Sequence, residues 1–201
     1  MSIVKLNNRG VKDVTAFGSI SSLGELTFIS KQTASSSATI SFTSGIDSTY
    51  KEYIFYFNNI HPSDEADFTF QANAVGGSGY NETITSTTFD AFNRENDTQA
   101  VLNYYASTDQ AQGTSFQSIS LYDTGNEDDE SGVGELIIFN PSNTTFVTQF
   151  ISNFAGTSRY NYPNTGYVAG YFNTTSAIDA IQFKMDSGNI DSGTIKLYGI
   201  S

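Results

Sequence analysis

The sequence predicts an all-β protein: an antiparallel, jelly-roll-like β-sandwich with an irregular N-terminal arm. The first observation is composition, since the chain has 12 Tyr and 16 Phe but no Trp and only 3 Pro. Aromatic residues and Thr favour the pleated surface of strands, whereas Gly and Asn favour tight turns. The second observation is that short apolar segments alternate with turn residues along the chain, as is typical of sandwiches and jelly rolls.

The length of 201 residues fits one such domain, which buries roughly 70% of the surface that its unfolded chain exposes. We divide the chain into an arm, residues 1–22, and a sandwich domain, residues 23–201. The arm, "MSIVKLNNRGVKDVTAFGSISS", has no sustained apolar period, so we expect a loosely attached segment. It also lacks the apolar stretch of a secretory signal.

The first half of the domain contains five predicted strands, at residues 25–32, 37–44, 49–60, 68–75 and 81–89. In the second of them, Ala38, Ile40 and Phe42 fall on one face. The centre of the third, residues 53–57, is apolar or aromatic at every position. We therefore expect a central strand whose second face is covered by loops or by a neighbouring subunit. Residues 90–113 have no clear period and hold either a short helix or a long excursion.

The second half contains six predicted strands, at residues 114–122, 134–140, 145–155, 166–174, 177–185 and 193–200. We expect the last two to form a hairpin closed by the turn Gly-Asn-Ile-Asp-Ser-Gly. In that arrangement Ile181 and Phe183 share the core with Ile195 and Leu197. The final strand should lie inside a sheet between two neighbours, because buried backbone groups need hydrogen-bond partners.

Charge is distributed unevenly along the chain, whose net charge is −12. From Glu52 to Arg159 there are 15 acidic residues, whereas the arm carries Lys5, Arg9 and Lys12. An acidic body repels the nucleic-acid backbone and anionic lipid, so we expect neither nucleic acid nor membrane insertion. The basic arm is the predicted anchor to a larger particle, because an extended segment can join a host sheet or wrap a neighbour.

The residue types needed for common catalytic sites are scarce. There is no cysteine, and the single histidine, His61, precedes Pro62 in a predicted turn. The sequence contains no nucleophile elbow, phosphate-binding loop or paired metal-ligand motif. We therefore predict a protein that is not an enzyme and has no cofactor.

The segment "DTGNEDDESG", residues 123–132, concentrates acidic side chains. Asp123, Glu127, Asp128 and Asp129 offer the hard oxygen ligands that calcium prefers. Their spacing does not match the helix-loop-helix calcium loop. The favoured interpretation is a solvated loop without metal, and calcium binding is the alternative.

Three tyrosines near the end of the chain, Tyr160, Tyr162 and Tyr167, are candidate contacts for glycan or for another subunit. Their rings could stack on sugars. Aromatic side chains are also enriched in subunit interfaces.

Three long segments carry a resemblance to a known group of proteins. They are "FTSGIDSTYKEYIFYFNNIHPSDEADFTFQ", "GELIIFNPSNTTFVTQFIS" and "YVAGYFNTTSAIDAIQFKMDSGNIDSGTIKLYGI", the last closing on "SGTIKLYGI". These segments resemble virion-associated structural proteins of marine tailed phages, and the similarity covers most of residues 20–200. The group is defined by its location in the virion, so it implies a particle protein and supplies no catalytic residues.

The resemblance and the residues together give one expected function and two alternatives. We expect a virion structural protein that decorates the head or forms part of a head or tail fibre. It would assemble as a homotrimer through aromatic sheet faces, including residues 50–57, and contact other virion proteins. The first alternative is a receptor-binding module for host-surface glycan, and the second is a polysaccharide depolymerase.

Overall fold

A computed structural model describes residues 25–200. Within this range the chain forms two antiparallel sheets. The larger has nine strands: β1 (Leu26–Thr33), β3 (Glu52–Pro62), β5 (Ile84–Asn93), β6 (Ala100–Tyr104), β7 (Ala111–Gly113), β9 (Gly132–Phe139), β10 (Thr148–Ser158), β11 (Tyr162–Phe172) and β13 (Ile190–Ile200). The smaller has four: β2 (Ile40–Phe42), β4 (Phe68–Ala74), β8 (Gln117–Ser118) and β12 (Ile178–Met185). A short 3₁₀ helix, η1 (Ala106–Thr108), precedes β7.

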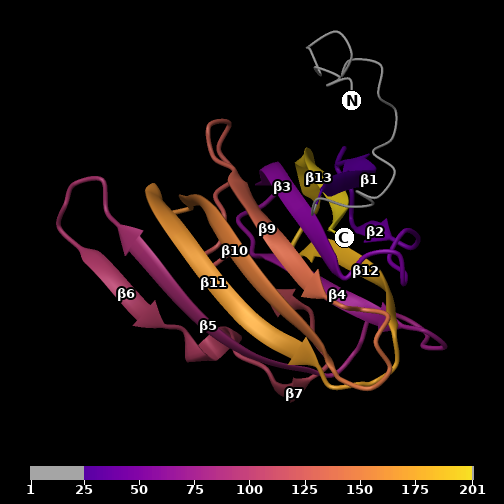
Figure 1. Cartoon of the computed structure of the whole chain (residues 1–201). Coiled ribbons are helices and arrows are strands. Elements are labelled where there is room, and N and C mark those ends of the chain that lie inside the picture. The colour runs from indigo at the N-terminus through magenta and orange to yellow at the C-terminus, as the bar shows by residue number, and fades with distance from the viewer. Residues whose placement is uncertain (1–24, 201) are drawn as a thin grey trace, which may run out of the picture.

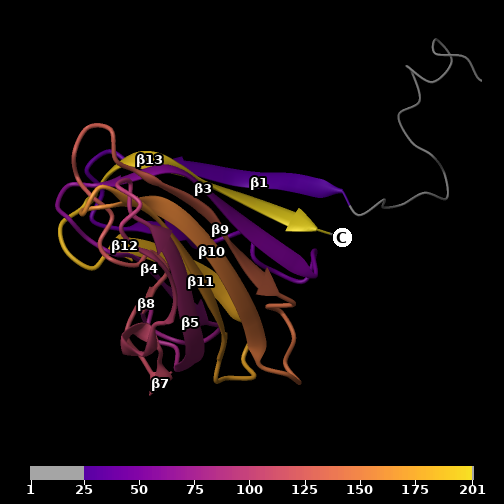
Figure 2. The same cartoon turned by 90° about the vertical axis from the view of Figure 1, so that its left-hand side faces the viewer.

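The strand order of the large sheet is β1-β13-β3-β9-β10-β11-β5-β6, and β7 also pairs with β5. The small sheet has the order β2-β12-β4-β8. Figure 1 shows the large sheet in front of the small one, and Figure 2 shows the two layers from the side. The chain passes repeatedly from one layer to the other, for example from β1 to β2 and back to β3. The predicted jelly-roll-like β-sandwich is therefore confirmed.

Aromatic side chains fill the space between the two sheets. Phe55 and Phe57 come from the large sheet, and Phe68 and Phe183 come from the small one. The ring of Phe183 meets Phe55 edge to face, with centroids 5.2 Å apart, and stacks on Phe68 at 5.6 Å. Edge-to-face and offset-stacked pairs are the favoured aromatic geometries, so these rings add specific contacts to the burial of apolar surface.

The predicted hairpin of the last two strands is wrong. The strand β12 pairs with β2 and β4 in the small sheet, whereas β13 pairs with β1 and β3 in the large one. The short link between them therefore crosses from one sheet to the other. Alternation gives the inward residues of each strand but not the sheet to which the strand belongs. Ile181, Phe183, Ile195 and Leu197 are nevertheless all buried in the common core, and β13 lies inside its sheet as expected.

Two other predicted strands are shorter than expected. Only Gln117–Ser118 of residues 114–122 is a strand, because the next two backbone N–H groups, of Ile119 and Ser120, both donate to the carbonyl of Phe68. In the second predicted strand, Ile40 and Phe42 are buried but Ala38 is exposed. The unassigned residues 90–113 hold the end of β5, then β6, η1 and β7.

Among residues 25–200, no helix is long and apolar enough to cross a membrane.

Candidate functional site

The outer face is defined here as the side chains of the nine-stranded sheet that point away from the four-stranded sheet. Strand register places one row of them across seven strands: Phe28, Tyr198, Ile54, Ile137, Ile151, Ala169 and Thr87. Six of the seven are apolar or aromatic. Residues on the solvent side of an antiparallel sheet are ordinarily polar, so this row departs from the usual pattern.

Exposed apolar side chains concentrate on the same face. Eleven large hydrophobic or aromatic residues of the described range are exposed. Eight of them belong to the outer face by register: Leu26, Phe28, Phe89, Leu102, Tyr104, Val133, Ile151 and Tyr167. The other three, Val75, Phe146 and Tyr160, lie between strands. A clustered apolar surface of this kind marks an interaction site more often than scattered residues do.

A stacked aromatic pair lies in the next row of the outer face. The rings of Phe89 and Tyr167 have centroids 4.9 Å apart and are nearly parallel. Tyr104 of the edge strand β6 pairs with Phe89 on the other side. Tyr167, one of the tyrosines singled out from the sequence, therefore sits among exposed aromatic residues rather than alone.

The other two candidate tyrosines lie where β10 turns into β11. Tyr160 is 55% exposed, and the guanidinium of Arg159 lies 4.7 Å above its ring. Tyr162 is buried and its ring stacks on Phe92 at 4.8 Å. The structure thus separates the three tyrosines: Tyr160 and Tyr167 present surface at different places, and Tyr162 packs in an internal aromatic cluster.

The outer face is electrically neutral on a strongly acidic domain. The whole chain has nine basic and 21 acidic residues, of which three basic and one acidic lie in residues 1–24. Residues 25–200 therefore contain six basic and 20 acidic residues, a net charge of −14. Where the strands of the large sheet pair in regular register, their outward side chains include four charged residues, Lys31, Lys196, Glu52 and Glu135, whereas Asp191 lies beyond the register shifts at the start of β13. Their charges cancel, and the remaining −14 lies elsewhere on the domain.

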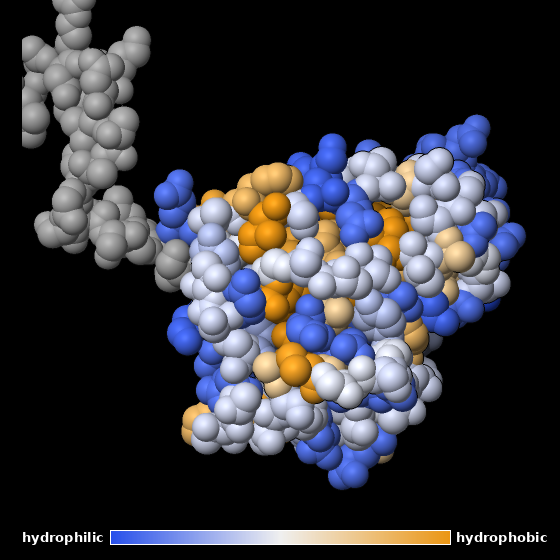
Figure 3. Space-filling view, turned by 90° about the vertical axis from the view of Figure 1, so that its right-hand side faces the viewer, coloured by the Kyte–Doolittle hydropathy of each residue, from blue (hydrophilic) through white to orange (hydrophobic). Residues whose placement is uncertain are grey.

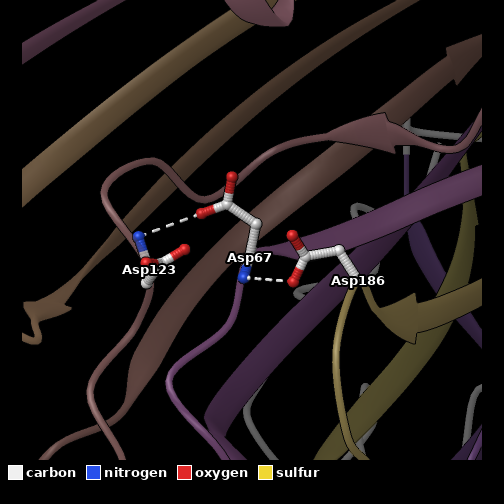
Figure 4. A group of neighbouring side chains, drawn as sticks. All are labelled: Asp67, Asp123 and Asp186. Atoms are coloured by element: carbon white, nitrogen blue, oxygen red, sulfur yellow. Dashed lines mark hydrogen bonds between the residues drawn. The ribbon is translucent and has the colours of Figure 1, made fainter.

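Three carboxylates come together at one end of the sandwich. Asp67 directly precedes β4, Asp186 directly follows β12, and Asp123 lies in the loop before β9. One carboxylate oxygen from each of the three residues lies within 4.8 Å of the corresponding oxygens of the other two. The backbone N–H of Asp123 donates to Oδ1 of Asp67 at 3.1 Å, as Figure 4 shows. Oxygen ligands of this type suit Ca²⁺ or Mg²⁺, so this cluster is the best-placed candidate cation site among the described residues.

The pKa of the Asp67 carboxyl is raised to about 6, chiefly by burial and in addition by the nearby carboxylates of Asp123 and Asp186. Hydrogen bonds act in the opposite direction, since the hydroxyl of Ser118 donates to Oδ2 of Asp67 at 2.7 Å. Asp123 also pairs with the guanidinium of Arg159, Nη1 to Oδ2 at 2.9 Å. Protein groups therefore already engage much of the cluster.

A polar cavity of about 430 Å³ adjoins Asp67 and Asp186. Its lining consists mainly of hydroxyl, carboxyl and amide groups, contributed by Thr69, Ser107, Thr108, Asp109, Gln110, Ser115 and Ser118. Such a lining suits a small polar solute more than an apolar one.

The rest of the sequence-derived calcium candidate does not join this cluster. Glu127, Asp128 and Asp129 are exposed at the tip of their loop. Glu130 is buried, and its carboxylate accepts a hydrogen bond from the backbone N–H of Glu127 at 3.0 Å. Only Asp123 of the four candidates meets other carboxylates. Its partners Asp67 and Asp186 become neighbours because Phe68 pairs with Met185, a register that the sequence does not reveal.

The predicted anchoring residues Lys5, Arg9 and Lys12 lie outside the described residues. The described chain begins next to β1, which is an edge strand of the large sheet. A groove of about 420 Å³ lies between β1 and β2, the edge strands on one side of the sandwich. Figure 3 views this side, where hydrophobic residues surface in a narrow, interrupted band between hydrophilic ones.

Comparison with protein-family models and with curated proteins finds no match.

Proposed function

We propose that this chain is a non-enzymatic structural protein of a tailed-phage particle, where it decorates the head or forms part of a head or tail fibre. The observation that carries the proposal is the apolar, charge-neutral outer face on an otherwise acidic sandwich. A protein displayed at high density on a particle needs a charged surface for solubility and a separate surface for assembly. The domain has both.

The phage setting comes from the sequence resemblance. Its segments contain β3, β12 and β13 and parts of β4, β9, β10 and β11, which belong to both sheets of the sandwich. The closing "SGTIKLYGI" is most of β13, whose residues alternate between the core and the outer face. The resemblance thus concerns the framework that creates the assembly surface, and the proposed homotrimer would form through that framework.

Attachment to other virion proteins is assigned to the arm. The basic residues Lys5, Arg9 and Lys12 give residues 1–24 a charge of +2 beside a domain of −14. A basic extended segment is suited to an acidic neighbour or to pairing with an exposed sheet edge.

Deletion of residues 1–20 tests this proposal. The shortened chain should fold and self-associate like the full chain, as judged by circular dichroism and sedimentation. It should be missing from particles produced when it replaces the full chain, as judged by mass spectrometry of purified virions. Normal incorporation would remove the arm from the mechanism, and absence of the full chain from virions would refute the particle assignment.

A second candidate function is binding of host-surface glycan, which the exposed Tyr160 favours. Its ring is 55% exposed beside Arg159, and an aromatic face next to hydrogen-bond donors is a common way to hold a sugar ring. A glycan array probed with the full chain and with Tyr160→Ala tests it. Binding that Tyr160→Ala abolishes and Phe146→Ala preserves would favour this function over a purely structural one.

A further inference from the structure

The outer face has no partner within the described residues, although it is the most apolar exposed part of the domain. Eight of the eleven exposed large hydrophobic or aromatic residues lie on it. The row through Ile54, Ile137 and Ile151 crosses the centre of the sheet, where Ile151 is 49% exposed and Ile54 is already buried. Sheets with one face in water ordinarily place polar residues there, so this composition requires a covering partner.

We infer that the outer face binds a second copy of this chain, so that copies pack sheet against sheet or sheet against edge through the row from Phe28 to Ala169. This inference deepens the self-association in the proposed function by naming its surface.

Charge selects another copy as the occupant. Outside this face, residues 25–200 carry four basic and 18 acidic residues, so most approaches of one copy to another are repulsive. On the face itself, Lys31 and Lys196 lie on β1 and β13, whereas Glu52 and Glu135 lie on β3 and β9. A face with equal positive and negative charges on separate strands can pack against another copy without net repulsion.

The size of the face also fits. Seven strands spaced about 4.8 Å apart span about 29 Å, and strands of 11 residues such as β10 and β11 extend about 37 Å. The resulting area is on the order of 1,000 Å², whereas a stable interface needs about 800 Å² on each partner. Its exposed aromatic residues include Tyr167 on β11 and Phe89 on β5, and aromatic side chains of this kind are enriched in interfaces.

Sedimentation equilibrium of the full chain with matched substitutions tests the inference. Ile151→Glu places a charge at the centre of the face on a side chain that is 49% exposed, so the fold should tolerate it. Phe146→Glu is the matched control, because Phe146 is 70% exposed but lies off the face. At micromolar concentration the wild-type mass should be at least twice the 21.8 kDa of one chain. Ile151→Glu should weaken association at least about 10-fold, as loss of a central interface residue does, and Phe146→Glu should not.

A second readout does not depend on weakening the assembly. The chain has no cysteine, so Ile151→Cys and Phe146→Cys each create one labelling position. Spin labels at position 151 of neighbouring copies should lie closer together than labels at position 146. A wild-type chain that stays at 21.8 kDa, equal effects of the two Glu substitutions, or closer labels at position 146 would each overturn the inference. None of these results depends on particle incorporation, which tests the proposed function separately.

Discussion

The backbone N–H of Asp67 donates a hydrogen bond to Oδ1 of Asp186 at 2.9 Å, which ties the start of β4 to the end of β12. The two residues are neighbours because Phe68 and Met185 pair in the small sheet. Asp123 completes the cluster from a loop that follows β8. Three connections of the sandwich therefore meet around the half-buried carboxyl of Asp67.

This cluster predicts a stability that depends on pH. The pKa of Asp67 is raised from 3.8 to about 6, first by burial, so the folded state binds a proton more tightly than the unfolded state. Stability should therefore fall as pH rises from about 4 through 6, by up to about 3 kcal/mol from this one group. The free energy of urea unfolding, measured at pH 4.5 and pH 8, checks the direction.

Asp67→Asn removes the charge while keeping the shape. It should gain stability relative to the wild type at pH 8, and the gain should shrink at pH 4.5. The control is Asp128→Asn, since Asp128 is exposed on the loop tip away from the cluster. The difference in free energy of unfolding between the wild type and Asp67→Asn should depend on pH. If that difference were the same at pH 4.5 and pH 8, the raised pKa could not belong to Asp67.

The aromatic core predicts a large loss of stability on removing Phe183. Its ring contacts Phe42, Phe55, Phe57 and Phe68 and is fully buried. Phe183→Ala should lower the free energy of unfolding by about 3–5 kcal/mol, because a cavity replaces these contacts. Phe146→Ala, at a ring that is 70% exposed, should change it by less than about 0.5 kcal/mol. A similar loss at both positions would mean that Phe183 is not a core residue.

A close backbone approach predicts that Gly134 cannot be enlarged. A methyl group at this position would lie 2.3 Å from the carbonyl oxygen of Asn153 on the neighbouring strand β10. Gly134→Ala should therefore cost about 1–3 kcal/mol, as overpacking does. Gly156→Ala is the control, because its methyl would meet neighbours at 3.4 Å, an ordinary contact. Thermal unfolding of both variants tests the difference, and equal melting temperatures would contradict it.

Much of the fold could be predicted from the sequence because alternation along each strand is local. The inward positions of β4, such as Phe68 and Phe70, and those of β13, such as Ile195 and Leu197, follow directly from it. The sheet to which β12 belongs could not be predicted, since an inward apolar pattern is the same in either layer. The short length of β8 could not be predicted either, because the backbone N–H groups of Ile119 and Ser120 both donate to the carbonyl of Phe68 and interrupt the expected pairing.

The candidate sites were less predictable than the fold. The run of apolar residues at 53–57 indicated that a second face of that strand needed cover, and Ile54 indeed lies in the row across the outer face. The rest of that row required register, because Ile137 and Ile151 are adjacent only through strand pairing. The Asp67 cluster required register in the same way, since its members are separated by more than 50 residues.

The position of β13 between β1 and β3 has a consequence for how the molecule is made. The strands β1 and β3 are joined in the large sheet only by β13, which lies between them. This part of the sheet can therefore form only when strands far apart in the sequence pair with one another. Sheets dominated by such distant pairings form slowly. A fragment lacking β13 would keep the strands β1 and β3 with unpaired edges, which are prone to aggregate. We therefore expect the chain to become competent for ordered assembly only after β13 has paired with β1 and β3, and to be prone to aggregation before that.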